Sequence, residues 1–229
     1  MAQLNDVVRG QITDYDERTG TVTIKAQYSD FPTMCRREYK EVDVKFLDSR
    51  PLSEKQRRSC YAMIREIAEW SGDETSEVKQ YLKVDFWASE IMDTADTMFS
   101  LSNAPMSVVA GFQRWLARFI VRNDIPCKKS LLTYIDDVDD YTYACLVHKK
   151  CVICGKRADL HHIDAVGAGR DRTEIIHEGL EVLPICREHH QEIHTIGKNE
   201  FLKKYHLNGG IKADKTICKL YRLKTRKEA

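Results

Sequence analysis

Cysteine and histidine residues gather in the last third of this 229-residue chain. Cys151 and Cys154 form a C-x-x-C pair, and Cys186 and His189 form a C-x-x-H pair after 31 intervening residues. Sulfur and nitrogen ligands in this number satisfy tetrahedral zinc and leave no open position on the ion. The spacing therefore predicts a closed, structural zinc site. The alternative, buried free thiols, does not account for two matched pairs.

More histidines lie between and after these ligands than a zinc site requires. His161 and His162 are adjacent in a short apolar segment, and His190 and His194 lie on a predicted helix. Residues i and i+4 share a helix face, whereas neighbours point about 100° apart. His190 and His194 can therefore bind one ion together while His189 points towards the cysteines. This pattern predicts a second metal near His161, His190 and His194, with coordination positions left open.

Adjacent residues cannot easily bind the same ion, so His161 and His162 should take different roles. One would bind the metal, and the other, with an ordinary pKa of about 6.5, could take a proton from water. A metal with open positions can neutralise a phosphate oxygen and stabilise the leaving alkoxide. A general base together with such a metal ion is what phosphodiester hydrolysis requires. A single histidine here is better interpreted as a hydrogen-bonded structural residue, but five at these spacings favour a site.

The composition excludes several classes of protein. With 36 Lys+Arg, 35 Asp+Glu and 42% hydrophobic residues, the chain is neither disordered nor membrane-like. No apolar run approaches the roughly 20 residues of a membrane span, and the first residues contain no apolar signal region. We therefore expect a cytoplasmic protein that does not contact a membrane. Such a reducing compartment favours metal sites over disulfides.

The near-neutral net charge of +1 hides a division. Residues 151–229 contain 15 Lys+Arg and 11 Asp+Glu, whereas residues 1–150 contain 21 and 24. An acidic body is thus joined to a basic end. That end includes a predicted tail that could hold nucleic acid electrostatically or could simply be solvated. Its basic residues are Lys212, Lys215, Lys219, Arg222, Lys224, Arg226 and Lys227.

The elements that position these residues follow from periodicity and turn signals. The first 48 or so residues are predicted to form strands, with a hairpin turn at Glu17–Gly20 before Thr21–Ala26 and a third strand at Val42, Val44 and Phe46. Ser53 and Gln56 predict a capped helix that ends near Gly72. Further helices are predicted over 75–87, 105–121 and 135–146, with apolar stripes typical of a core. Strands at 160–163 and 183–185 and a helix over 187–196 would carry the histidines.

These elements predict an α+β fold class in three parts. An N-terminal β-hairpin region would occupy residues 1–48, a helical bundle 49–147, and a small zinc-stapled unit with the basic tail 148–229. Zinc would stabilise the fold of that unit, which is too short to hold itself by its core alone. The remaining cysteines are interpreted as small hydrophobic residues. They are Cys35, Cys60, Cys127, Cys145 and Cys218.

A row of arginines on the helix over 105–121 is a further candidate for nucleic-acid contact. Arg114, Arg118 and Arg122 recur at i, i+4 and i+8, away from the apolar stripe. Such a row could follow a phosphate backbone. The alternative is a solvated helix face.

The motifs from Cys151 onwards resemble the HNH nuclease family. They are Cys151-x-x-Cys154, His161-His162, and Cys186-Arg187-Glu188-His189-His190 followed by His194. More closely, residues 151–206 resemble HNH nucleases of phages of Gram-positive bacteria, through 166–172 and Phe201-x-x-x-Tyr205-His206 as well. The resemblance implies a ββα-metal fold and His162 as the general base. It also implies that His161, His190 and His194 bind a catalytic Mg, Mn or Ni ion.

The sequence departs from the family at the central Asn, since no Asn lies between His162 and Cys186. His177 is the candidate to take its role of fixing the loop and orienting the base, with a surface loop histidine as the alternative. Arg170 and Arg172 lie in a Gly-rich loop between the strands. They are predicted to clamp DNA because the guanidinium fork suits phosphate oxygens. The alternative there is a solvated loop.

Residues 50–127 carry a second, weaker resemblance, to the phage Orf/NinB recombination proteins. It rests on Arg50–Arg58 and on Glu77-Val78-Lys79. This resemblance implies a homodimer that binds single-stranded or branched DNA, with a recombinase or a single-strand-binding protein as partner.

The sequence therefore predicts a DNA-binding phage recombination protein whose HNH endonuclease domain hydrolyses phosphodiester bonds with a divalent ion. The alternative is a single-stranded-DNA-binding recombination mediator whose HNH domain is structural or only weakly active, as the missing Asn would suggest. A zinc-ribbon interaction module would explain the cysteines but leave the histidines without a role.

Overall fold

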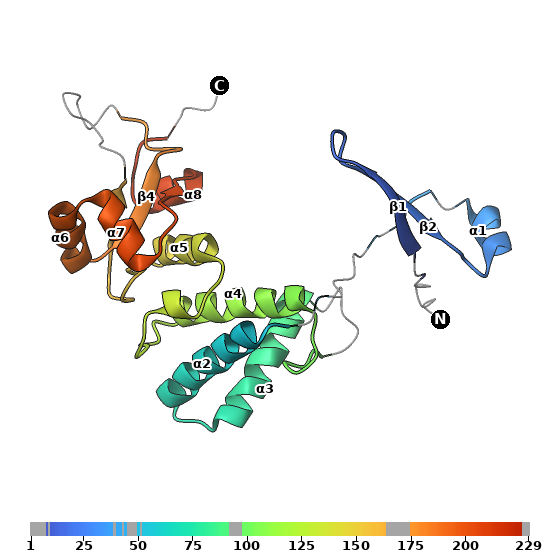
Figure 1. Cartoon of the computed structure of the whole chain (residues 1–229), viewed down its shortest axis with the longest axis horizontal. Helices are drawn as coiled ribbons and strands as arrows, with labels where there is room; N and C mark the ends of the chain where they lie inside the picture. Colours follow the sequence, from blue (N-terminus) through green and yellow to red (C-terminus); the bar gives the residue numbers. More distant parts are fainter. Residues whose placement is uncertain are drawn as a thin grey trace. The chain divides into compact units, whose positions relative to one another are not determined.

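The computed structural model describes residues 8, 10–38, 40–42, 44, 50, 52–91, 98–163 and 175–225. It divides the chain into two compact units, Met1–Phe46 and Leu47–Ala229. The first unit contains a β-hairpin, and the second combines helices with a small sheet (Figure 1). The predicted α+β fold class is confirmed. None of the helices in the described part of the chain is both long and apolar enough to cross a membrane.

The first unit is built on an antiparallel hairpin of β1 (Gly10–Asp16) and β2 (Thr21–Ala26). The predicted turn closes because Asp16 Oδ1 accepts hydrogen bonds from the backbone N–H groups of Arg18 at 2.9 Å and Thr19 at 3.4 Å. Gly20, at φ +70°, supplies the left-handed conformation that completes the turn. Both strands are exposed along their whole length.

The remainder of the first unit differs from the prediction. Helix α1 (Phe31–Arg37), which was not expected, follows the hairpin. It begins at Asp30, whose carboxylate accepts a hydrogen bond from the Thr33 N–H at 3.3 Å. The predicted third strand is wrong where it can be checked. Residues 40–42 and 44, the described part of that segment, belong to no strand, and Val42 is 83% exposed.

The helical part of the second unit matches the prediction closely. Helix α2 (Glu54–Ser71) starts with the complete capping box of Ser53 and Gln56, and it ends at Gly72 in the left-handed conformation. Helix α3 (Thr75–Phe86) continues into the π-helical turn η1 (Trp87–Ile91), and α4 (Met106–Arg122) follows. Helix α2 packs against both α3 and α4. Apolar residues from all three helices lie in one buried core, as their stripes predicted.

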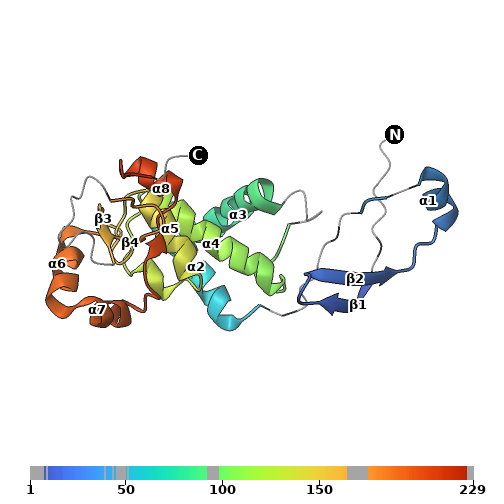
Figure 2. The same ribbon diagram turned by 90° about the horizontal axis from the view of Figure 1, so that it is seen from above.

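That core continues into the C-terminal part of the same unit. The turn η2 (Leu131–Thr133) leads to α5 (Val138–Val147). Helix α5 contacts both α4, which precedes it in the sequence, and β4 (Glu181–Ile185), which follows it. Strand β4 pairs with β3 (Asp159–His162) and also contacts α6 (Arg187–Ile196) (Figure 2). The buried cluster runs without a break from Cys60 on α2 to Phe201. The helices therefore give the metal-binding segment a large shared core.

The segment predicted as a basic tail is folded over part of its length. Helix α7 (Lys198–Tyr205), strand β5 (Ile211–Lys212) and helix α8 (Lys215–Leu220) follow α6, and β5 completes a sheet of order β3-β4-β5. Ile217 and Cys218 on α8 are fully buried against Leu146 and Val182 in a second apolar cluster. The lysines there lie on the outer faces of folded elements.

Candidate metal centres and active site

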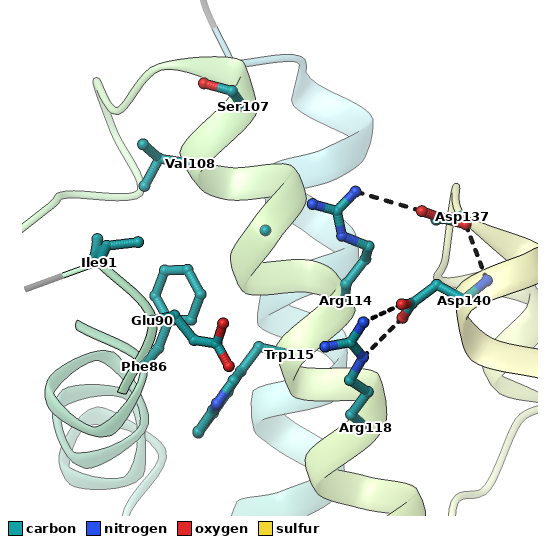
Figure 3. Close-up of a pocket in the computed structure, with 11 residues that line it drawn as sticks. Phe86, Glu90, Ile91, Ser107, Val108, Arg114, Trp115, Arg118, Asp137 and Asp140 are labelled. Atoms are coloured by element: carbon teal, nitrogen blue, oxygen red, sulfur yellow. Dashed lines mark hydrogen bonds and ion pairs between the residues drawn. The ribbon is translucent and has the colours of Figure 1, made fainter. Parts of the chain in front are cut away.

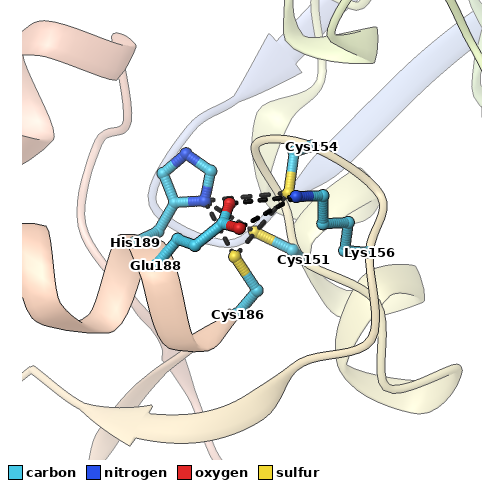
Figure 4. A network of polar contacts seen from close by, with 6 residues as sticks. All are labelled: Cys151, Cys154, Lys156, Cys186, Glu188 and His189. Atoms are coloured by element: carbon cyan, nitrogen blue, oxygen red, sulfur yellow. Dashed lines mark hydrogen bonds and ion pairs between the residues drawn. The ribbon is translucent and has the colours of Figure 1, made fainter.

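Three cysteine sulfurs and one histidine nitrogen converge between the Cys151–Cys154 turn and the start of α6 (Figure 4). His189 Nδ1 lies 3.1 Å from Cys186 Sγ and 3.5 Å from Cys151 Sγ. Cys154 Sγ lies 3.7 Å from both His189 Nδ1 and Cys186 Sγ. All four atoms lie within 4.8 Å of one another. The residues predicted to bind structural zinc are therefore together in space.

Local backbone structure explains how these side chains meet. The Gly155 N–H donates to the Cys151 carbonyl at 2.8 Å, and the Cys151 N–H donates to the Lys156 carbonyl at 2.7 Å. The resulting tight turn needs Gly155 at φ +70° and points both of its cysteines inward. Cys186 is the N-cap of α6, so His189 comes one helical turn later and faces the same centre.

The dimensions and chemistry of this cluster fit zinc. Ligands about 2.0–2.3 Å from a tetrahedral zinc lie roughly 3.3–3.8 Å from one another, close to the separations found here. Burial raises the pKa of Cys151 to about 12, so this thiol keeps its proton until a cation replaces it. Zinc binding should therefore release protons and favour the folded state strongly. With four protein ligands, the site leaves no position for a substrate.

Residues with no role in the sequence interpretation support this cluster. The Lys156 ammonium lies 3.0 Å from both carboxylate oxygens of Glu188, and its pKa is raised chiefly by that carboxylate and further by Cys154 and Cys186. The Tyr205 ring meets the His189 ring edge-on at 5.5 Å, and its hydroxyl donates to Glu192 at 2.8 Å. The spacing of Glu188 and Glu192 around His189 on α6 was the available signal for such supporting residues.

A second cluster contains only histidines. His161 on β3 faces His190 and His194 on α6, with ring centroids 4.8 and 5.4 Å away, and the two α6 rings are 4.7 Å apart. One nitrogen of each ring lies within 4.8 Å of the others. His161 is half-buried, whereas His190 and His194 are exposed. Three neutral imidazoles in this arrangement suit a divalent transition-type ion and leave its remaining positions open to solvent.

The protonation behaviour of this cluster favours a cation. Burial, together with the nearby His190 and His194, lowers the pKa of His161 to about 4. Burial also lowers the pKa of His190. A neutral imidazole is the metal-binding form, so the lowered pKa keeps His161 available to an ion below neutral pH.

His162 points away from this cluster and contacts His177. Successive side chains on a strand alternate, so His161 and His162 lie on opposite faces of β3. His162 Nε2 lies 2.8 Å from His177 Nδ1, a hydrogen-bond distance. The backbone N–H of His177 donates to the backbone carbonyl of Lys224 at 2.9 Å, which connects this loop to the C-terminal segment. Burial lowers the pKa of both imidazoles, and the proximity of His177 lowers that of His162 further.

A family model described as "Putative HNHc nuclease" matches residues 32–224. The chain belongs to this family. Comparison with curated proteins and with solved structures gives no match. The HNHc nuclease match includes the helical segment that resembles the Orf/NinB proteins, and no comparison supports that second resemblance. The family relationship is consistent with phosphodiester hydrolysis and implies nucleic acid as the substrate.

The predicted DNA-contacting arginines have different positions relative to this HNHc site. Arg170 and Arg172 lie outside the described residues. Arg114 and Arg118 form ion pairs with carboxylates at the start of α5. Arg114 pairs with the N-cap residue Asp137 at 3.4 Å, and Arg118 contacts Asp140 in the first turn twice (Figure 3). The Arg122 guanidinium stacks over the Phe119 ring at 5.7 Å. Much of this row therefore joins α4 to α5, and a phosphate would have to replace those carboxylates.

Proposed function

We propose that this protein is a metal-dependent endonuclease that hydrolyses phosphodiester bonds in DNA, with His162 as the general base. The observation that carries the proposal is the 2.8 Å contact between His162 and His177 on the strand that also presents His161 to the three-histidine cluster. A base with a fixed ring and a cation site with open positions thus share one short strand.

The contact with His177 engages Nε2 of His162 and leaves its Nδ1 for the reaction. If Nε2–H donates to His177 Nδ1, the lone pair of Nδ1 on His162 is free to take a proton from water. The same contact holds the ring in one orientation. This is the role that the family's central Asn would otherwise take. The absence of an Asn therefore does not imply the absence of a positioning residue.

His161, His190 and His194 would bind the divalent ion of this reaction, which we propose to be Mg, Mn or Ni. When bound, such an ion neutralises charge on the scissile phosphate and on the departing 3′ oxygen. By holding that ion, the three imidazoles would position the phosphate, and His162 would take a proton from the attacking water. Arg170 and Arg172 are proposed to contact neighbouring phosphates.

We propose hydrolysis of DNA and no role in recombination. A role in recombination, a recombinase partner and a homodimer depended on the Orf/NinB resemblance, which no comparison supports. The mediator alternative depended on a missing positioning group, and the His162–His177 contact weakens that reason.

A cleavage assay with matched variants tests the proposal. Purified protein is incubated with single-stranded, duplex and branched DNA in Mg²⁺, Mn²⁺ or Ni²⁺. We expect cleavage with at least one ion, and a loss of about 10²–10⁴-fold in rate for His162→Ala. Thermal unfolding should be similar in both proteins, since His162 is outside the buried core. Cleavage that His162→Ala does not slow would overturn the assignment of the base, and binding without cleavage under every ion would favour the mediator.

A further inference from the structure

The outer face of α2 carries a second basic surface, remote in sequence from the histidines. Six residues on successive turns of this helix line a hollow of about 380 Å³. They are Glu54, Arg57, Arg58, Tyr61, Ala62 and Arg65. We call these residues the α2 surface. Three arginines on one face stand out because residues 1–150 as a whole carry more acidic than basic side chains.

The arginines of the α2 surface are less neutralised than those of α4. Glu54 is its one carboxylate, and it contacts both Arg57 and Arg58, the latter at 3.5 Å. The Arg58 side chain is 81% exposed. Arg65 is also exposed and makes no ion pair with any described residue. By contrast, Arg114 and Arg118 each have a carboxylate at the start of α5 as partner, as Figure 3 shows.

A neighbouring helix adds positive charge and an aromatic contact. The Lys79 ammonium of α3 lies over the Tyr61 ring at 5.9 Å from its centroid. Burial, and after it the charge of Lys79, lowers the pKa of Lys83. The Lys83 ammonium lies over the Phe99 ring, 5.4 Å from its centroid. Tyr61 is 37% exposed in the centre of the arginines. The surface therefore combines guanidinium groups with a partly open aromatic ring.

We infer that the α2 surface binds the phosphate backbone of a nucleic acid strand. Arg58 and Arg65 are seven residues apart, which places them about 10.5 Å apart along the helix, so their guanidinium groups can contact different phosphates of one strand. Tyr61, halfway between them, can stack on a sugar or base. The exposed pairs with Glu54 are weak, so phosphate oxygens can replace that carboxylate.

This inference rests on the proposed nuclease function, because it adds a second contact for the same substrate within one folded unit. Residues of α2 and the histidine clusters belong to the unit Leu47–Ala229 and share a continuous core. A contact on α2 would bind DNA away from the hydrolysed bond and so raise affinity without taking part in the chemistry.

Binding measurements on full-length protein carrying His162→Ala, which keeps the substrate intact, test the inference. Fluorescence anisotropy with labelled single-stranded and duplex oligonucleotides is recorded over a range of salt concentrations. We expect Arg58→Ala/Arg65→Ala to weaken binding to the single strand about tenfold and to reduce the slope of log K against log salt by about 1.4, as for two lost phosphate contacts. Arg58→Lys/Arg65→Lys should restore the slope, because it restores the charge.

A matched control removes two basic charges elsewhere. Arg36→Ala/Arg37→Ala acts on helix α1 of the other unit and should leave both affinity and slope unchanged. Equal weakening of binding by this control would overturn the inference, and so would unchanged binding in Arg58→Ala/Arg65→Ala. A change in the self-association of Arg58→Ala/Arg65→Ala, measured by ultracentrifugation, would overturn it as well. The proposed function is judged separately: absence of metal-dependent cleavage in the wild-type protein, with binding that still depends on Arg58 and Arg65, would overturn the nuclease assignment alone.

Discussion

The two metal-capable clusters lie on the same helix but differ in chemistry and in exposure. The first combines three cysteines with His189, and its Cys151 and Cys186 are almost completely buried. The second contains three imidazoles, two of them exposed. Helix α6 supplies both clusters through the adjacent residues His189 and His190, which the helical twist directs to different sides. A single turn of helix thus links a closed site to an open one.

The two clusters would separate stability from reactivity within a short segment. Four protein ligands saturate tetrahedral zinc, so the closed site can stabilise the fold without activating water. Three protein ligands leave room for a substrate oxygen. If this division is correct, damage to the first cluster should unfold the C-terminal part of the chain, and damage to the second should remove activity from a folded protein.

The largest effect is expected for a zinc ligand. Cys186→Ser should abolish cooperative folding of the C-terminal segment, since structural zinc contributes about 10–16 kcal/mol in small domains, as much as the whole stability of most proteins. Metal analysis should find about one zinc per wild-type chain and much less in the variant. Hydrogen exchange should show loss of protection in β3, β4 and α6. Cys35→Ser, at an exposed position, is the control and should keep zinc and fold.

A ligand of the open cluster should give the opposite result. His194→Ala leaves His161 and His190 and removes an exposed side chain, so the thermal midpoint and zinc content should stay close to wild type. The cleavage rate should fall by roughly 100-fold or more, and higher concentrations of divalent ion should recover part of it, because the ion binds more weakly. Zinc loss or unfolding in this variant would contradict the separation of the two clusters.

A smaller effect is expected at the residue that contacts the base. His177→Ala should slow cleavage about tenfold, and His177→Asn should slow it less, because an amide oxygen can also accept a hydrogen bond from His162. The pH–rate profile distinguishes positioning from simple structural damage. Burial and the proximity of His177 lower the pKa of His162, so loss of this imidazole should move the acidic limb of the profile to higher pH in His177→Ala and less far in His177→Asn. An unmoved limb in both would argue against this contact.

Local signals allowed the sequence to predict much of the second unit. The Ser53–Gln56 capping box and the helix Arg187–Ile196 depend on neighbouring residues, and both are found as predicted. The convergence of the four zinc-type ligands was also predictable, because paired spacings encode that geometry. By contrast, β5 and α8 are too short to be recognised locally. They are held by burial of Ile217 and Cys218 against distant residues, which a run of lysines conceals.

Other errors have the same physical origin. Alternation at Val42 and Val44 suggests a strand, but a strand also needs a neighbour to pair with, and the described residues there remain exposed. The arginine row on α4 was visible in the sequence, whereas its acidic partners lie at the start of α5, more than twenty residues away. The contact between His162 and His177 likewise joins a strand to a loop. Contacts between distant segments decide these cases, and one sequence does not reveal them.

The smallest effect concerns how the open cluster responds to acid before an ion binds. Burial and the neighbouring imidazoles lower the pKa of His161 to about 4, whereas an unfolded chain would have about 6.5. Between these values the unfolded state binds more protons, so acidification through this window destabilises the fold. After discounting for solvent exposure of this half-buried group, we expect about 1 kcal/mol between pH 7 and pH 5, or a thermal midpoint about 2–4 °C lower.

His161→Asn isolates that contribution, because protonation of the zinc ligands affects both proteins equally. Without added divalent ion, the wild-type midpoint should fall more between pH 7 and pH 5 than that of His161→Asn. Added Mn²⁺ should reduce the fall of the wild-type midpoint between pH 7 and pH 5, because it binds the neutral imidazoles of the folded state only. An identical fall in the two proteins would mean that the imidazoles do not interact as their ring separations imply. The open cluster would then be three independent surface histidines, and its contrast with the closed site would no longer hold.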